Sequence, residues 1–165
     1  MHIAIAGNIG SGKTTLTGLL AKNLKWEAHY EDVDTNPYLH SFYEDAYIFA
    51  PNLHSMNLMS TRDFENYKSL FELISSLIKP PDLIIYLRAS VPTLVSQIQK
   101  RGREYESAIR IDYLKNLNDV YEEWVENYKL GKILFIDVDN LKVNENTEHL
   151  GVVIDKVNAE LHGLF

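Results

Sequence analysis

The sequence predicts an α/β domain with a mostly parallel sheet, and three observations support this. Short apolar runs alternate along the chain with segments whose apolar residues recur at helical spacing. The run Leu83 to Leu87 is apolar throughout, as expected of a strand covered on both faces. The chain has 165 residues, 45% of them hydrophobic, which is enough for a sizeable core, so we expect a single domain over residues 1–165.

Four segments are predicted as strands of the parallel sheet. Each is a short apolar or partly alternating run, and turn residues bound most of them. The four predicted strands are Ile3–Gly7, Trp26–Glu31, Leu83–Leu87 and Ile133–Val138.

Helices are expected between and after these strands. The first, Lys13–Leu24, places Leu16, Leu20 and Leu24 on one face. The segment Asp32 to Pro51 has weak periodicity and is predicted as loop with a short helix. The remaining predicted helices run from a Ser60/Asp63 capping pair to before Pro80, from Ser90 to near Gly102, from Asp112 to Gly131, and from Thr147 to His162.

The composition excludes several classes of protein. Sixteen Lys and Arg against 23 Asp and Glu give a net charge of −7, and the only dense basic cluster, Lys100 to Arg110, is interrupted by acidic residues, so we expect no nucleic-acid partner. There is no cysteine, which rules out disulfides and thiolate metal sites. No apolar run is long enough to span a bilayer and no export signal is recognised, so we expect a cytoplasmic protein without a membrane partner.

A phosphate-binding loop is the strongest motif in the chain. The sequence from Gly7 to Thr14 matches G-x-x-x-x-G-K-[ST] and lies between a predicted strand and a predicted helix. In such loops backbone N–H groups hold the phosphates, so Lys13 is expected to reach the β- and γ-phosphates of a nucleotide and Thr14 to coordinate Mg²⁺. The predicted ATP-binding residues are Gly7, Asn8, Ile9, Gly10, Ser11, Gly12, Lys13, Thr14 and Thr15.

Other features favour a phosphotransferase over a GTPase. Neither the guanine-reading Asn/Thr-Lys-x-Asp element nor an Asp-x-x-Gly switch occurs. Glu31 ends a predicted strand, where ligands gather in open α/β sheets, so it is a candidate general base; a solvated acidic face is an equally open interpretation. From Trp26 through Thr61 there is no Lys or Arg, which favours an acceptor hydroxyl without a phosphate of its own.

A basic segment follows the helix predicted to end near Gly102. Arg101 and Arg103 flank this glycine, and arginines on such a segment suit contact with a transferring phosphoryl group. A solvated helix C-terminus, where basic residues are common, explains the same pattern. Both interpretations remain open from the residues alone.

Several motifs in order along the chain together resemble the deoxynucleoside kinase family, in its bacterial deoxyadenosine/deoxyguanosine kinase branch. They are Gly7 to Thr15, Trp26-Glu27-x-x-x-Glu31, Asn36-Pro37-Tyr38-Leu39 with Phe42-Tyr43, Ala46-Tyr47-Ile48-Phe49-Ala50, Pro81 to Leu87, Arg101-Gly102-Arg103-x-x-Glu106 and Tyr113-Leu114-x-x-Leu117. The resemblance implies a three-layer P-loop kinase sandwich, a homodimer, and transfer of the ATP γ-phosphoryl group to the 5′-hydroxyl of a deoxynucleoside, a purine being favoured.

The resemblance also implies roles for individual residues. Glu31 matches the carboxylate that activates the 5′-hydroxyl, and Arg101 and Arg103 match arginines on the transferring phosphate. The other substrate residues follow by position: Tyr43 and Glu106 for the sugar 3′-hydroxyl, Phe49 for stacking on the base, and Asp45 for reading it. The segment Asp139 to Leu141 matches the loop below the donor adenine.

The chain departs from the family pattern between Asp45 and Ala46. There the family has a long helix with a base-reading Gln and Arg, then a strand ending in Asp/Glu-Arg-Ser. The block is absent here, so one central strand should be missing and four should remain. With it go an acidic residue that helps Thr14 position Mg²⁺ and an arginine that grips the phosphoryl group. We therefore expect phosphoryl transfer by this chain to be weak or lost. The alternatives are a non-catalytic ATP-binding module and a nucleoside-monophosphate kinase.

Overall fold

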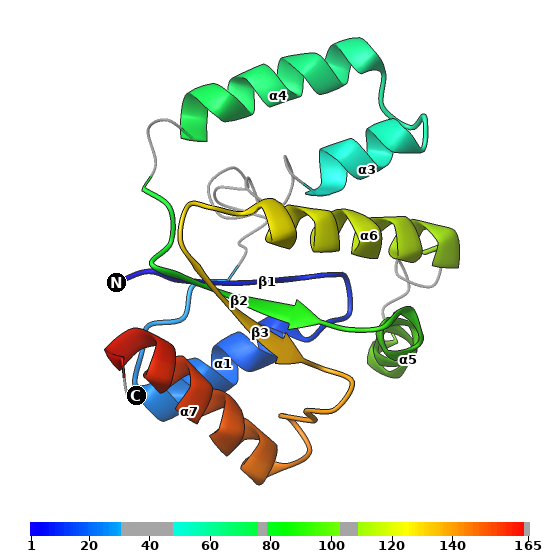
Figure 1. Cartoon of the computed structure of the whole chain (residues 1–165). Helices are drawn as coiled ribbons and strands as arrows, with labels where there is room; N and C mark the ends of the chain where they lie inside the picture. The colour runs from blue at the N-terminus through cyan, green and yellow to red at the C-terminus, as the bar shows by residue number, and fades with distance from the viewer. Residues whose placement is uncertain (31–47, 76–78, 103–108, 164–165) are drawn as a thin grey trace. The chain divides into compact units, whose positions relative to one another are not determined.

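A computed structural model describes residues 1–30, 48–75, 79–102 and 109–163 of the chain (Figure 1). The chain falls into two compact units. The first comprises Met1–Tyr30, Pro81–Leu114 and Gly131–Phe165, and the second comprises Glu31–Pro80 and Lys115–Leu130. The single domain expected over residues 1–165 stays a prediction.

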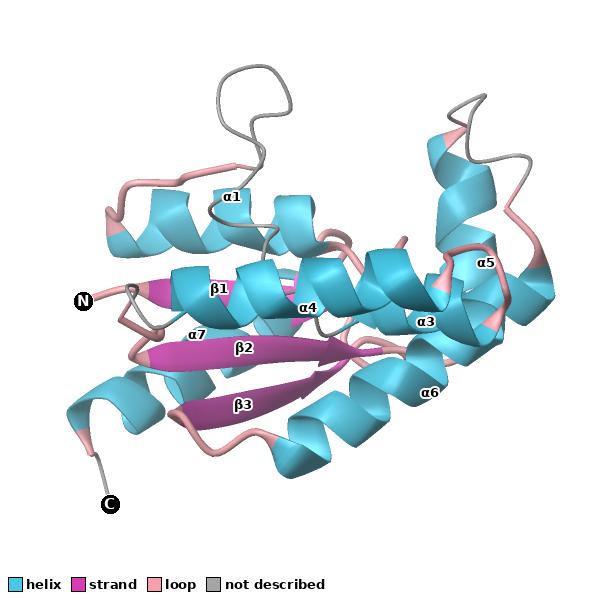
Figure 2. Cartoon of the chain, turned by 90° about the horizontal axis from the view of Figure 1, so that it is seen from above, coloured by secondary structure: helices cyan, strands magenta, loops and turns pink. Residues whose placement is uncertain are grey.

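The first unit contains a parallel sheet of three strands in the described residues. These are β1 (Ile3–Gly7), β2 (Leu83–Arg88) and β3 (Lys132–Asp137), with β2 in the middle (Figure 2). Gly7 is paired in register with Leu87, which is in turn paired with Ile136. Because all three strands run in the same direction, the loop after β1 and the loop after β3 leave the sheet at its carboxyl edge.

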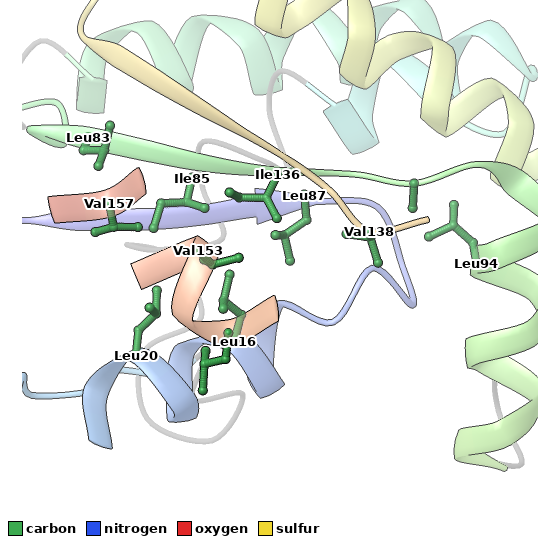
Figure 3. Close-up of a cluster of buried hydrophobic side chains, with 12 residues drawn as sticks. Leu16, Leu20, Leu83, Ile85, Leu87, Leu94, Ile136, Val138, Val153 and Val157 are labelled. Carbon is green, nitrogen blue, oxygen red and sulfur yellow. The ribbon is translucent and has the colours of Figure 1, made fainter. Parts of the chain in front are cut away.

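Helices α1 (Lys13–Leu24), α5 (Val91–Arg101) and α7 (Thr147–His162) also belong to this unit. Side chains of α1, α7 and the odd-numbered positions of β2 meet in one apolar core (Figure 3). Its members include Leu16, Leu20, Leu83, Ile85, Leu87, Leu94, Ile136, Val153 and Val157, each at most 3% exposed. On the other face of β2, Ile84 and Tyr86 are also buried, which explains why the strand is apolar at every position.

The second unit contains helices α3 (Ala50–Ser55), α4 (Thr61–Ser75) and most of α6 (Ile111–Asn127). The ring of His54 stacks on that of Phe64, 4.6 Å between centroids, and its Nε2 lies 3.2 Å from the Thr61 hydroxyl. These contacts join α3 to α4. Ile48, Phe71, Leu117 and Tyr121 are buried in this unit, so it has apolar side chains shielded from water.

The predicted strand Trp26–Glu31 is wrong for the residues that the structure describes. Lys25 adopts a left-handed conformation with φ of 56°, and the Trp26 N–H donates to the Ala21 carbonyl, which ends α1. Residues 26–30 follow without strand structure. A strand needs a neighbour to receive its backbone hydrogen bonds, and the family resemblance puts the expected neighbour in the block that should be missing between Asp45 and Ala46. The described sheet therefore has three strands, where we expected four.

The predicted helices are largely confirmed. The first and last helices, α1 and α7, match the predicted bounds, Gly102 follows the end of α5 with φ of 65°, and the Ser60 hydroxyl accepts from the Asp63 N–H as a capping pair. The predicted end at Gly131 is wrong because α6 stops at Asn127, four residues earlier. None of the described helices combines the length and apolarity that crossing a membrane requires.

Candidate active site

The phosphate loop, residues Gly7 to Thr14, joins the end of β1 to the start of α1. Gly10 and Gly12 have φ of 85° and 96°, a region that residues with a Cβ rarely adopt. The Ser11 N–H donates to the Asn8 carbonyl at 3.0 Å, which closes a turn inside the loop. The glycines of the motif are thus required by the backbone path.

Two of the glycines also allow close packing. A Cβ on Gly7 would lie 2.9 Å from the carbonyl oxygen of Leu87 on β2. One on Gly10 would lie 2.8 Å from Cγ1 of Ile98 and 3.1 Å from the Leu94 carbonyl oxygen, both on α5. The loop is therefore set tightly between the sheet and α5.

The Lys13 ammonium folds back over the loop. Its Nζ donates to the carbonyl oxygen of Gly7 at 2.5 Å and lies 3.5 Å from that of Asn8. These carbonyls keep the charge over the loop, where it can meet a phosphate group. The role of Lys13 at the β- and γ-phosphates stays a prediction.

The N-terminus of α1 is suited to an anion. Gly12 occupies the capping position, makes no side-chain cap, and the first turn carries no acidic residue. The first N–H groups of a helix have no partner within it, and its dipole attracts negative charge. Thr14 and Thr15 in this turn are exposed. Phosphate groups at this end of α1 would satisfy these donors.

A solvent-open hollow lies beside the phosphate loop. Ser11, Gly12 and Thr15 line one side, and Gln97 of α5 lines another. The loop after β3 adds Leu141, Lys142, Val143 and Asn144, and the remaining lining is apolar: Leu16, Leu87, Ile136 and Val138. The hollow thus combines apolar walls with a few polar groups, as small-molecule sites commonly do.

The loop between β3 and α7 is held by its own polar side chains. The Asp137 carboxylate accepts from the N–H of Asp139 at 2.9 Å and from the side-chain amide of Asn140 at 2.7 Å. The Lys142 N–H donates to Nδ1 of His149 at 3.0 Å. Since Nδ1 accepts, the neutral ring carries its hydrogen on Nε2. These bonds fix the wall of the hollow that this loop provides.

Asp139 links the same loop to α5. Burial raises the pKa of its carboxyl, but hydrogen bonds from Thr93 and from the N–H and hydroxyl of Ser90 outweigh this effect, so the pKa lies below its ordinary value. Ser90 is the N-cap residue of α5 but makes no side-chain cap, and its hydroxyl donates to Asp139 at 3.2 Å. Asp139 supplies the negative charge at the start of α5.

The structure places some of the predicted site residues and leaves others outside the described residues. The residues predicted to bind ATP, Gly7 to Thr15, form one loop and helix start in the first unit, where Arg101 is the exposed last residue of α5. Phe49, in the second unit, is half-buried at the N-cap of α3. Glu31, Tyr43, Asp45, Arg103 and Glu106 lie outside the described residues, and their roles stay predictions.

The described residues include no cluster of three His, Asp or Glu side chains that could hold a metal ion. Thr14 fits the role of a single protein ligand, since its hydroxyl-bearing side chain is exposed in the first turn of α1. Mg²⁺ commonly takes most of its ligands from substrate phosphates and water, so one hydroxyl at this position is compatible with it.

The sequence analysis missed the polar residues around the hollow. Gln97 is far in sequence from Lys142 and Asn144, and none of the three belongs to a motif. The sequence could have predicted only that they lie near the carboxyl edge of the sheet, because residues that follow a parallel strand gather there.

Comparison with known proteins reveals relatives over nearly the whole chain. It is 26% identical over 201 residues to the deoxyadenosine/deoxycytidine kinase of Bacillus subtilis (strain 168), covering 97% of this chain and 93% of that protein. It is 31% identical over 157 residues to the deoxyguanosine kinase of the same strain, covering 73% and 76%. The structure of deoxyadenosine kinase from M. mycoides with bound dCTP superposes with a TM-score of 0.80 at 26% identity, covering 96% and 100%.

The comparisons also fit an internal deletion. The alignment with the deoxyadenosine/deoxycytidine kinase of Bacillus subtilis extends over 201 residues, more than the 165 of this chain. That kinase therefore has residues without a counterpart here. The family model for deoxynucleoside kinases matches in two stretches, residues 3–47 and 40–162. Residues 40–47 match both stretches, which is expected if similar sequences on either side of a lost block have been fused, and the expected junction of Asp45 and Ala46 lies in this overlap. The chain belongs to the deoxynucleoside kinase family.

Proposed function

We propose that this protein transfers the γ-phosphoryl group of ATP to the 5′-hydroxyl of a purine deoxynucleoside. The observation that carries the proposal is the phosphate loop, in which Lys13 Nζ already bonds the Gly7 carbonyl beside an uncapped α1 N-terminus. Phosphoryl transfer needs charge stabilisation and positioning more than covalent chemistry. A lysine and the N–H groups at a helix N-terminus supply both to a triphosphate.

The hollow beside the loop is the proposed site of the donor base. Leu141 and Val143 offer apolar contact, while Gln97 and Asn144 offer amide groups for hydrogen bonds. Thr14 would hold Mg²⁺, which when bound bridges the phosphates and neutralises their charge. Arg101, at the last position of α5, is the described cation proposed to face the transferring group.

Glu31 is the proposed general base, and a deoxynucleoside is the proposed acceptor. The absence of Lys and Arg from Trp26 through Thr61 supports an acceptor without its own phosphate. Named relatives act on deoxyadenosine, deoxycytidine or deoxyguanosine, so a deoxynucleoside is the shared acceptor class and the preference for a purine is the finer proposal.

The lost block gives weight to a second function, a module that binds ATP without transferring its phosphate. The two stretches that the family model matches, residues 3–47 and 40–162, fit a loss inside the family region. The phosphate loop and the hollow lie in the first unit and do not use that block. ATP binding should therefore survive even where transfer is weak.

A single-turnover experiment separates the candidates. The protein is mixed with γ-labelled ATP, Mg²⁺ and deoxyadenosine, deoxyguanosine, deoxycytidine or deoxyadenosine monophosphate, and ATP binding is titrated in parallel. Transfer to the purine deoxynucleosides supports the first proposal. Binding without transfer supports the second, faster transfer to the monophosphate indicates a nucleoside-monophosphate kinase, and absence of ATP binding refutes the assignment of the phosphate loop.

A further inference from the structure

The phosphate loop contacts two helices that are consecutive in the chain, α5 and α6. On the α5 side, Gly10 lies so close to Ile98 and Leu94 that an added Cβ would be 2.8 Å from Ile98 Cγ1. Ile98 is itself only 7% exposed and stands one turn before Arg101. The last turn of α5 therefore rests against the loop.

On the α6 side, the contact is made by a buried amide. Asn8 is 1% exposed, and its Nδ2 donates to the carbonyl oxygen of Leu114 at 3.1 Å. Its Oδ1 accepts from the Ile9 N–H at 2.7 Å. Both polar atoms of the side chain are thus satisfied, one by the phosphate loop and the other by α6.

Leu114 lies in the first turn of α6, which begins at Ile111. Its N–H donates to the Arg110 carbonyl at 3.2 Å, and its side chain is 2% exposed. Asn8 and Leu114 both belong to the first unit. The bond is therefore a fixed connection between the loop and the start of a helix 106 residues further along the chain.

We propose that Asn8 is a positioning residue that transmits the state of the phosphate loop to the first turn of α6. Gly10 does the same for the last turn of α5 by packing. Phosphate groups that hold the loop in one conformation also hold the two helix ends that rest on it. The inference uses the proposed function only in taking ATP as the ligand of the loop.

The loop holds α5 by a packed contact and α6 by a hydrogen bond, and these two kinds of contact should respond differently to substitution of Asn8. The contact at Gly10 involves only the main chain of the loop and does not depend on Asn8. The link to α6 is directional and needs an amide donor at position 8. Loss of that donor should therefore release the start of α6 and leave the end of α5 unaffected.

The test is hydrogen exchange of backbone amides in the full chain, followed by mass spectrometry with and without ATP and Mg²⁺. In wild type, saturating ATP should slow exchange in peptides ending α5 (residues 96–102) and starting α6 (residues 109–116). In Asn8→Asp, which keeps the acceptor for Ile9 but loses the donor, exchange at the start of α6 without ATP should be about two- to tenfold faster, as for loss of one hydrogen bond.

A second readout separates transmission from mere loosening. At an ATP concentration shown by titration to saturate Asn8→Asp, protection at the end of α5 should persist while protection at the start of α6 is lost. Asn8→Ala, which removes both polar atoms without adding charge, should behave in the same way. Asn127→Asp is the matched control, since Asn127 Nδ2 makes the same kind of bond, to Glu123 O at 2.8 Å, at an exposed position on α6.

Two results would overturn the inference. One is unchanged exchange at the start of α6 in both Asn8 variants without ATP, and the other is ATP protection there that equals the wild type. If wild type binds no ATP, the proposed function fails, and the ATP-free comparison alone decides whether Asn8 holds α6.

Discussion

The carboxylate of Asp139 accepts hydrogen bonds from both the N–H and the hydroxyl of Ser90, at 3.1 and 3.2 Å, across 49 residues of sequence. This pair joins the loop after β3 to the start of α5. Both elements line the hollow beside the phosphate loop. The geometry of the hollow therefore depends on a charge at its margin.

Stability should fall at low pH through Asp139. Burial raises the pKa of the Asp139 carboxyl, but hydrogen bonds from Thr93 and Ser90 outweigh burial, so the pKa is lower in the folded state. The carboxylate therefore stabilises the fold at pH values above its unfolded pKa near 4. This stabilisation is lost as the pH falls through the lowered pKa of the folded state. Asp139→Asn should cost about 0.5–1 kcal/mol at pH 7. In urea unfolding, the difference in the free energy of unfolding between wild type and Asp139→Asn should be smaller at about pH 3 than at pH 7. A pH-independent difference would contradict this account.

Lys13→Ala should raise the Kd for ATP at least about tenfold, because a charged hydrogen-bond donor to the phosphates is removed. Lys22→Ala is the matched control, as Lys22 is an exposed lysine near the other end of α1. Titration calorimetry measures both. Equal affinities of the two variants would remove Lys13 from the phosphate site.

Gly10→Ala should abolish ATP binding or strongly weaken it. The new Cβ would meet Ile98 at 2.8 Å and the Leu94 carbonyl oxygen at 3.1 Å, and the φ of 85° is strained for alanine. Gly151→Ala is the control, since Gly151 is within α7 and nothing lies within 4 Å of its added Cβ. That variant should gain about 0.5–1 kcal/mol of stability and keep its ATP affinity. Normal binding by Gly10→Ala would disprove the tight packing of the loop.

Substitution by leucine should change the stability of the protein in opposite directions at two buried asparagines. Asn52 is 0% exposed, and within the described parts of the chain its side-chain amide has no hydrogen-bond partner, whereas the Asn8 amide bonds Leu114 and Ile9. Burying an unpaired amide costs roughly 1–3 kcal/mol, so Asn52→Leu should stabilise the protein by part of that amount. Asn8→Leu should destabilise it by leaving the Ile9 N–H without its acceptor. Urea unfolding curves that move in the same direction would contradict the assignment.

Glu31→Gln should lower the rate of deoxyadenosine phosphorylation about 10²- to 10⁴-fold if Glu31 is the general base. Because transfer by this chain should be weak, the variant is made in a chain with the missing family block restored. Glu27→Gln is the control, as the Glu27 side chain is 85% exposed. The ATP affinity of both variants should equal that of the unsubstituted chain. Near-full turnover by Glu31→Gln would exclude Glu31 as the base.

Local patterns predicted the parts of the fold that local forces determine. The bounds of α1 and α7 follow from helical spacing, and the phosphate loop follows from its glycines. The strand at Trp26 failed because a strand exists only with a neighbour, and residues 26–30 form no ladder in the structure. The bonds of Asp139 to Ser90 and of Asn8 to Leu114 join residues distant in sequence, so no motif could reveal them.

The bond from Lys13 to the Gly7 carbonyl has a further consequence for the thermodynamics of binding. Because this bond ties the Lys13 side chain to its own loop, part of the conformational entropy of the loop is lost on folding and not on association. ATP must displace a carbonyl from the ammonium, which makes the binding enthalpy a difference between two charged hydrogen bonds. A modest enthalpy with a small entropic penalty is the signature to look for in calorimetry.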